Sequence, residues 1–133
     1  MAYFQWEDKY DLGVDKMNDE HQVLIDLMNK LYEENDKKSD KFVINQCINK
    51  LADWTKVHFA HEEAYMEEIG FPGIKQHKLI HQNLLSELDK YATEYHKGTE
   101  NQISPKFFSF LKLWLQAHII GIDMKYGEHA KAA

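Results

Sequence analysis

Two short stretches of the sequence pair a histidine with a carboxylate, or with a second histidine, at a spacing of four residues. His58 and Glu62 form the first pair, and His77 and His81 form the second. Residues four apart lie on one face of an α-helix, so the two side chains of each pair point in the same direction. A link rich in helix breakers, Ile69 to Gly73, separates the pairs. An antiparallel helix pair would therefore bring four potential metal ligands together.

The elements that would position these side chains are four amphipathic segments. Within each segment apolar residues recur at spacings of three and four, and no strand-like alternation competes. The predicted helices cover residues 18–37, 40–68, 72–97 and 105–126, and an aromatic-rich arm covers residues 1–17. Short links between long helices predict an all-α fold, an up-down-up-down antiparallel four-helix bundle with the N-terminal aromatic arm lying over it. We expect a single domain that spans residues 1–133.

Residue types with strong positional preferences suggest where these helices begin and end. Asn18 or Asp19 can cap the first helix, and Ser104 can cap the fourth. Pro72 fits the first turn of the third helix, where its missing N–H costs nothing. The fourth helix is expected to end near Gly127, since glycine commonly follows the last helical residue.

Every predicted helix carries a histidine at a position where its apolar stripe would otherwise hold a leucine. These histidines are His21, His58, His77, His81 and His118, and the carboxylates Glu62 and Asp123 accompany them. In an antiparallel bundle, a rise of about 1.5 Å per residue brings all seven groups to nearly the same level. A buried carboxylate is costly unless it is paired or binds a metal. The pattern therefore predicts a metal site inside the bundle.

The donor types and their number indicate the kind of metal site. Imidazole and carboxylate without thiolate suit iron, with zinc, manganese and copper less favoured. Seven ligands are too many for one ion, whereas two ions bridged by both carboxylates could use all of them. Five imidazole nitrogens, four carboxylate oxygens and a bridging oxygen leave one position open on two octahedral ions. The count predicts a dinuclear site with one vacancy, which suits a small ligand such as O₂.

This pattern resembles that of the hemerythrin family, in which a histidine of the first helix is followed by HxxxE, HxxxH and HxxxxD motifs. The resemblance covers nearly the whole chain and is strongest to the single-domain bacterial members. It implies a non-haem di-iron centre with a bridging oxo or hydroxo group that binds O₂ reversibly. The implied ligands are His77, His81 and His118 on one iron, His21 and His58 on the other, and Glu62 and Asp123 as bridges. The resemblance also implies that the vacancy is on the two-histidine iron.

Other residues are candidates for roles around such a centre. Tyr126 follows Asp123 by three residues and could donate a hydrogen bond to a bridging carboxylate. His61 lies next to Glu62 but off the apolar stripe, so we expect it at the surface, and it is the reserve candidate for a ligand. Apolar residues that could form a dry lining for O₂ are Ile25, Phe59, Trp114, Ile119 and Ile122.

The spacing of His118 and Asp123 is awkward for a shared site. The two residues are five apart, which places them about 140° apart around an ideal α-helix. They can meet at one site only if the helix loosens or bulges near Gly121, or if the carboxylate approaches from the side.

Composition narrows the possible partners and the compartment. A net charge of −6 argues against nucleic acid or an anionic membrane as the main partner. Lys or Asp interrupts the longer apolar runs, so we expect no membrane insertion and no signal peptide. The single cysteine, Cys47, fits a reducing compartment, and we expect a cytoplasmic location.

These observations favour an O₂-binding protein for carriage, storage or delivery, which is not an enzyme and passes O₂ to an O₂-consuming partner. The alternative is a sensor or scavenger of O₂, nitric oxide or redox state that acts through a partner protein. A di-iron oxidase is a third possibility, but related bundle enzymes use four carboxylates and two Glu-x-x-His motifs. A purely structural metal site is least favoured, because the ligand count leaves a vacancy.

Overall fold

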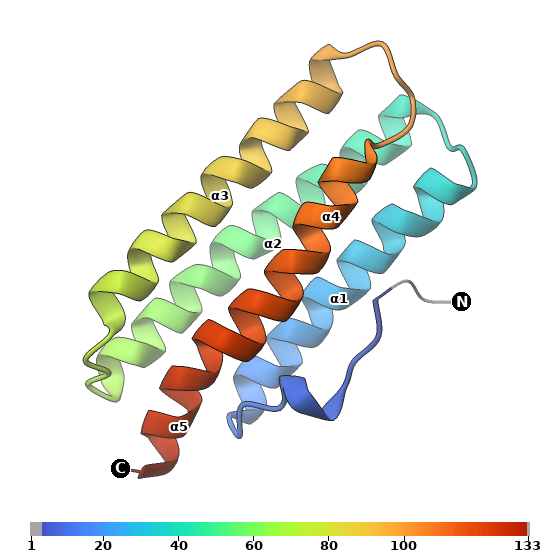
Figure 1. The fold of residues 1–133 in the computed structure, drawn as a ribbon. Coiled ribbons are helices and arrows are strands. Elements are labelled where there is room, and N and C mark those ends of the chain that lie inside the picture. The colour runs from blue at the N-terminus through green and yellow to red at the C-terminus, as the bar shows by residue number, and fades with distance from the viewer. Residues whose placement is uncertain (1–3, 133) are drawn as a thin grey trace.

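The computed structural model describes residues 4–132 and places four long helices side by side (Figure 1). Three of them are regular α-helices, and the fourth consists of two α-helical parts joined by a π-helix. The elements are α1 (Asp15–Asp36), α2 (Lys41–Glu68), α3 (Ile74–Lys97), α4 (Pro105–Leu113), the π-helix η2 (Trp114–Asp123) and α5 (Met124–Ala132). The described residues contain no strand, so the predicted all-α four-helix bundle is confirmed.

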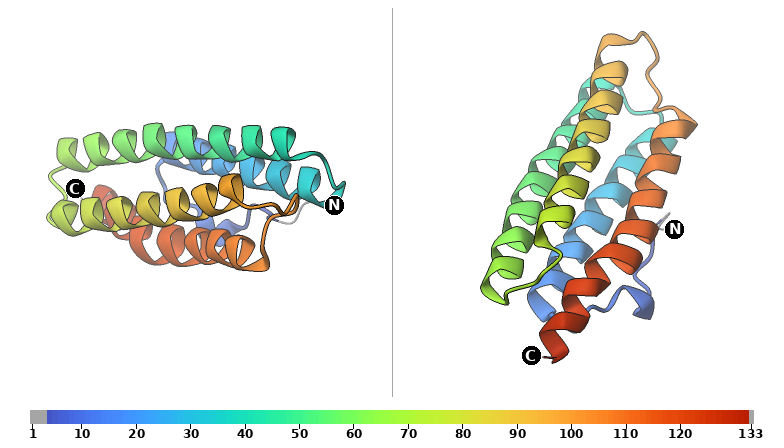
Figure 2. Two further views of the ribbon diagram at one scale, coloured as in Figure 1. Left: turned by 90° about the horizontal axis from the view of Figure 1, so that it is seen from above. Right: turned by 60° about the vertical axis from the view of Figure 1, so that its left-hand side comes forward.

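The links between helices lie at two opposite ends of the bundle, as an up-down-up-down topology requires. The α1–α2 and α3–α4 links are at one end, and the α2–α3 turn is at the other, near the start of α1 and the end of α5 (Figures 1 and 2). The beginnings of α1 and α3 therefore lie beside the ends of α2 and of the fourth helix. This arrangement brings together the parts of the chain that carry the seven predicted ligands.

Local capping interactions explain where two of the helices begin and where one ends. The Asp40 carboxylate accepts a hydrogen bond from the Val43 N–H at 3.0 Å, and the Ser104 hydroxyl accepts one from the Phe107 N–H at 3.3 Å. These bonds satisfy N–H groups that have no partner inside the helix. Gly70 follows the end of α2 with a φ of +67°, a backbone conformation that glycine adopts without steric cost.

The first helix begins at Asp15, so the prediction of a start near Asn18 was wrong. Asn18 does not cap the helix but binds the arm with its side chain. Its Oδ1 accepts a hydrogen bond from the Leu12 N–H at 3.0 Å, and its Nδ2 donates one to Asp11 Oδ1 at 2.8 Å. Because the carboxamide is used by the arm, the helix extends one turn further back than the residue types suggest.

The third helix begins at Ile74 and not at Pro72. The Ile74 N–H donates to the Phe71 carbonyl at 3.3 Å, which makes the preceding residues a turn. The first bond of α-helical spacing runs from the His77 N–H to the Gly73 carbonyl at 3.0 Å. Pro72 therefore rigidifies the turn and is not part of the helix.

The fourth helix continues to Ala132, past the end predicted near Gly127. Gly127 does not end the helix but lets the arm approach it. A Cβ atom at this position would lie 2.5 Å from the carbonyl oxygen of Leu12. The glycine is required by this close backbone contact and not by a change of backbone direction.

The N-terminal arm packs on the bundle from residue 4 onward and includes a short 3₁₀ turn, η1 (Asp8–Tyr10). Phe4, Tyr10 and Leu12 are buried in the hydrophobic core, and both main-chain polar groups of Phe4 bind the Asn29 side chain at 2.7 Å. Residues 1–3 of the predicted arm lie outside the described residues. Across the part of the chain that is described, no helix combines the length and apolar character that a membrane span needs.

Candidate metal centre

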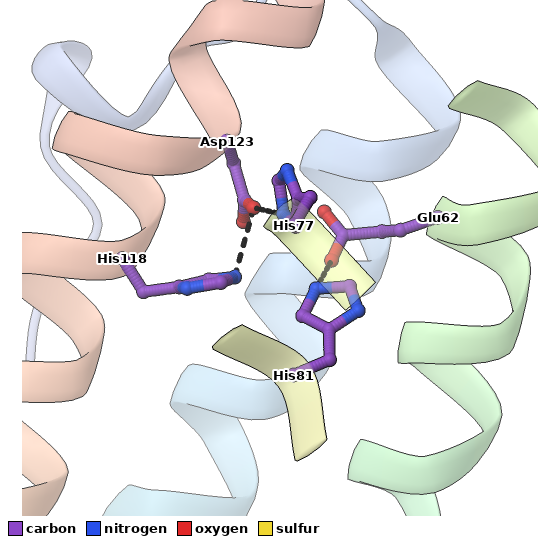
Figure 3. A group of neighbouring side chains, drawn as sticks. All are labelled: Glu62, His77, His81, His118 and Asp123. Carbon is purple, nitrogen blue, oxygen red and sulfur yellow. Dashed lines mark hydrogen bonds and ion pairs between the residues drawn. The ribbon is translucent and has the colours of Figure 1, made fainter. Parts of the chain in front are cut away.

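Seven polar side chains meet inside the bundle near the α2–α3 turn, and Figure 3 shows five of them. None of the seven exposes more than 4% of its surface. They are the predicted ligands His21 of α1, His58 and Glu62 of α2, His77 and His81 of α3, and His118 and Asp123 of η2. Their potential ligand atoms form two groups, each spanning no more than 4.8 Å, and both groups contain Glu62 and Asp123. One group adds three histidines, and the other adds two.

The distances between the potential ligand atoms fit ligands arranged around metal ions. His77 Nε2 and His118 Nε2 lie 2.8 and 2.9 Å from Asp123 Oδ1. The other contacts are His81 Nε2 to Glu62 Oε1 at 3.2 Å, His58 Nε2 to the same oxygen at 3.3 Å, and His21 Nε2 to Asp123 Oδ2 at 3.1 Å. Neighbouring ligands of an octahedral ion with bonds of roughly 2.1 Å are roughly 3 Å apart. The observed range is the one that shared ions would impose.

Most of these close contacts are not aligned as hydrogen bonds. Among the described residues, eight buried side-chain nitrogen and oxygen atoms have no hydrogen-bond partner, and all eight belong to six of the seven predicted ligands. They include both ring nitrogens of His21 and of His118, and one oxygen each of Glu62 and Asp123. A buried polar atom without a partner costs about 1–3 kcal/mol. The donor set therefore fits cations placed between the side chains.

The carboxylates of this cluster remain ionised in spite of their burial. Burial raises the pKa of Glu62, but the charge of His58 and the nearby nitrogens of His21 and His81 hold the pKa well below the usual value. For Asp123, burial and the Glu62 charge raise the pKa, and His118 and His21 lower it by more. Two buried anionic groups with imidazole nitrogens beside them are suited to binding divalent cations.

The two histidines of the two-histidine group, His21 and His58, have raised pKa values. Burial lowers the pKa of His21, but the carboxylates of Asp123 and Glu62, which lie 3.1 and 3.4 Å from its Nε2, raise the pKa above the usual value. For His58, burial likewise opposes protonation, yet Glu62 and Glu20 raise the pKa to about 10. The neighbouring carboxylates therefore favour protonation of His21 and His58, and a metal ion would compete with these protons.

The π-helix brings His118 and Asp123 to the same site although they are five residues apart. At its end, the Met124 N–H donates to the Ile119 carbonyl, which is a bond of i to i−5 spacing. His118 Nε2 consequently lies 2.9 Å from Asp123 Oδ1. A dashed line marks this contact in Figure 3. The loosening that the sequence required near Gly121 is present over Trp114–Asp123.

Tyr126 supports one of the shared carboxylates from outside the centre. It is fully buried, and its hydroxyl donates a hydrogen bond to Glu62 Oε2. Burial and the nearby Glu62 charge raise the pKa of the Tyr126 hydroxyl, so it stays protonated and acts as a donor. This is the contact that the sequence suggested for Tyr126.

Two further carboxylates bind ligand histidines and were missed by the sequence analysis. Glu20 Oε1 lies 2.7 Å from His58 Nδ1, and Glu63 Oε2 lies 2.9 Å from His81 Nδ1. Glu20 precedes His21 and Glu63 follows Glu62, and this adjacency to a predicted ligand is the sequence feature from which their role could have been predicted. A neighbouring residue is turned by about 100° around the helix, so it can contact the next helix instead of the centre.

His61 is not in either ligand group, in agreement with its expected position at the surface. Its side chain is 42% exposed, and its Nδ1 lies 2.8 Å from Glu20 Oε2. His61 therefore shares the Glu20 carboxylate with the ligand His58.

Phe59, one of the residues predicted to line an O₂ pocket, packs against the ligand histidines. Its ring stacks on His81 with centroids 3.7 Å apart and lies 5.7 Å from the His118 ring. The remaining predicted lining residues differ in burial. Ile25, Trp114 and Ile119 are buried, whereas Ile122 is only half-buried. The lining role of these four residues stays a prediction.

Comparisons with known proteins place this chain in a family. Residues 12–130 match the family model described as the hemerythrin HHE cation binding domain. The chain is 30% identical over 132 residues to bacteriohemerythrin of Stenotrophomonas maltophilia (strain R551-3), covering 99% of this chain and 84% of that protein. It is 29% identical over 126 residues to bacteriohemerythrin of Clostridium acetobutylicum, covering 92% and 98%.

Solved structures agree with the sequence comparison. The crystal structure of wild-type hemerythrin matches this fold with a TM-score of 0.86 at 25% identity, covering 96% of this chain and 97% of that one. The bundle with its buried cluster of histidines and carboxylates is thus that of a cation-binding domain. The chain belongs to the hemerythrin family.

Proposed function

We propose that this protein binds O₂ reversibly at a non-haem di-iron centre and serves in oxygen carriage, storage or delivery. One observation carries the proposal, namely that the buried ligand atoms form two groups which share Glu62 and Asp123. Two shared carboxylates are what a pair of bridged metal ions requires. Membership of the hemerythrin family supports iron as the metal and O₂ as its ligand.

We assign the ligands to the two metal positions as the sequence implied. The three-histidine position takes His77, His81 and His118, and the two-histidine position takes His21 and His58. Glu62 and Asp123 would be shared by the two positions. A pair of iron ions held by these residues would supply the reversible two-electron chemistry that O₂ binding needs. The two-histidine position, which has fewer protein ligands, would be the one to take O₂.

The residues around the centre shield it and hold its ligands in place. Phe59 stacks on His81 and lies beside His118, where it keeps bulk water from the ligands. The Tyr126 hydroxyl holds Glu62 at the oxygen that lies 3.4 Å from His21 Nε2. A dry surrounding of this kind limits the entry of protons and anions, which would promote irreversible oxidation.

The closed character of the centre supports binding over catalysis on a larger substrate. All seven ligands are at least 96% buried. A surface cavity of about 420 Å³ lies elsewhere, lined by Tyr91, Tyr95 and Phe107 where α3 and α4 are joined. A site that admits only small molecules fits a carrier, and we propose that the protein is not an enzyme.

The physiological context stays a prediction from the sequence. We propose that an O₂-consuming protein receives the O₂, and that the protein acts in the cytoplasm. Cys47, which is a free and buried thiol, supports the second point because a reducing compartment keeps such thiols reduced.

The test is a reversible optical response to O₂. Protein loaded anaerobically with Fe²⁺ should contain two irons per chain, develop a new visible absorption band on adding O₂, and lose it under argon. One zinc ion per chain in place of two irons would contradict the proposal. Rapid irreversible oxidation in air would instead favour the sensor or scavenger, and turnover of an added reductant would favour an oxidase.

A further inference from the structure

Glu20 is a nearly buried carboxylate of α1 whose two oxygens bind two different histidines of α2. Oε1 lies 2.7 Å from His58 Nδ1, and Oε2 lies 2.8 Å from His61 Nδ1. The main-chain carbonyl of Glu20 also accepts a hydrogen bond from Trp54 Nε1 at 3.3 Å. Glu20 is only 7% exposed, whereas the His61 side chain is 42% exposed. The three side chains thus connect a metal ligand with the protein surface.

The position of Glu20 favours one tautomer in each neutral histidine, because each of its carboxylate oxygens lies within hydrogen-bond distance of an Nδ1 atom. An ionised carboxylate can only accept hydrogen bonds, so both histidines donate from Nδ1–H. In neutral His58 the lone pair then lies on Nε2, the nitrogen that is 3.3 Å from Glu62 Oε1. This is the tautomer that a metal ion in the centre requires.

We propose that His61 is a positioning residue for His58 and acts on it through Glu20. His58 and His61 are one helical turn apart on α2, so they approach the same carboxylate from one side. With both oxygens bonded, Glu20 has a single orientation and holds the His58 ring in one plane. Without His61, the Oε2 atom loses its hydrogen-bond donor within the described chain, and the carboxylate is free to turn away from His58.

The effect falls on one metal position. His58 is one of only two histidines at the position that keeps a coordination site open for O₂, so a misplaced ring weakens this position strongly. At the three-histidine position, His81 Nδ1 is held by Glu63 Oε2 at 2.9 Å and does not depend on His61. The inference rests on the ligand assignment of the proposed function and deepens it.

Anaerobic titration with Fe²⁺ tests the proposal at each metal position. His61→Ala should still bind two ions at saturation, with an affinity about 3–10-fold lower at one position and unchanged at the other. Residues that hydrogen-bond directly to a metal ligand change metal affinity by about 10–100-fold, and His61 is one residue further away from the metal. Glu63→Ala should weaken the other position. His96→Ala removes an exposed histidine of α3 and is the matched control.

A spectroscopic measurement separates positioning from a general structural effect. In the Co²⁺-loaded protein, the Nδ1–H proton of His58 gives a shifted signal that exchanges with solvent, and His61→Ala should make that exchange faster. His61→Gln keeps an N–H donor and should largely restore both the signal and the affinity. His61→Phe keeps a ring without a donor and should behave like His61→Ala, which provides a second test if the alanine variant folds poorly.

Two results would overturn the proposal. The first is an affinity and exchange rate in His61→Ala equal to those of the His96→Ala control. The second is an equal loss at both metal positions, which would mean that His61 supports the fold and not His58. These measurements do not use O₂. If the protein bound two metal ions but did not bind O₂, the proposed function would be refuted and this test of His61 would remain valid.

Discussion

Replacing Tyr126 by phenylalanine removes one hydroxyl from the metal centre and leaves the aromatic ring in place. The ring packs against Tyr65 and His77, with centroids 5.9 and 5.7 Å away, and these contacts remain. The lost interaction is a hydrogen bond to the ionised Glu62, a type that contributes about 1.5–3 kcal/mol. Glu62 Oε2 keeps His21 Nε2 at 3.4 Å, so we expect a loss in the lower half of this range, about 1.5–2 kcal/mol.

Urea unfolding of the metal-free protein, followed by circular dichroism, measures this difference in the free energy of unfolding. Tyr65→Phe is the matched control, because Tyr65 contacts the Tyr126 ring and its hydroxyl makes no hydrogen bond within the described residues. The control should change the stability by less than about 0.5 kcal/mol. If Tyr126→Phe were no less stable than Tyr65→Phe, the hydrogen bond to Glu62 would not hold the carboxylate as described.

Three more predictions concern the ligands and the fourth helix. Glu62→Ala should abolish dinuclear iron binding while His61→Ala retains two irons at saturation, and metal analysis distinguishes them. Iron binding should release protons and become stronger as the pH rises. The reason is that His58, whose pKa is raised from 6.5 to about 10, must lose its proton to bind metal. Calorimetry in buffers of different ionisation heat measures the number of protons released. Gly127→Ala should destabilise the bundle by about 1–3 kcal/mol in thermal unfolding, since its Cβ would meet the arm. Gly121→Ala, whose Cβ meets nothing within 4 Å, should not be destabilising.

Much of the fold could be predicted because the helices follow local rules. Apolar periodicity fixed the four segments, and the second helix begins at Lys41 and ends at Glu68, within one residue of the prediction. Two of the three wrong boundaries arose where a tertiary contact used a residue that normally marks the beginning or the end of a helix, and the third, at Pro72, arose from a local turn. Asn18 binds the arm, and Gly127 accommodates the arm backbone, so neither marks a helix end. Contacts between distant segments of this kind leave no signal in periodicity.

The ligand set was easier to predict than the residues that support it. A histidine or carboxylate on an apolar stripe is unusual, and the helix rise places such residues along the bundle. Glu20 and Glu63, in contrast, lie beside the stripe, where charged residues are common and usually face water. Their role depends on which helix lies next to them and on its rotation, because Glu20 contacts His58 across the α1–α2 interface. The spacing of residues along one helix carries no information on either.

The fourth helix shows most clearly how the centre and the bundle constrain each other. A regular α-helix would direct His118 and Asp123 about 140° apart, so only one of them could face the centre. The π-helix between Trp114 and Asp123 turns both inward, and regular α-helix resumes at Met124. Because the regular turn follows at once, Tyr126 returns to the same side and reaches Glu62. One irregular segment thus allows a single helix to supply a histidine, a carboxylate shared by both metal positions, and a donor that holds the other shared carboxylate.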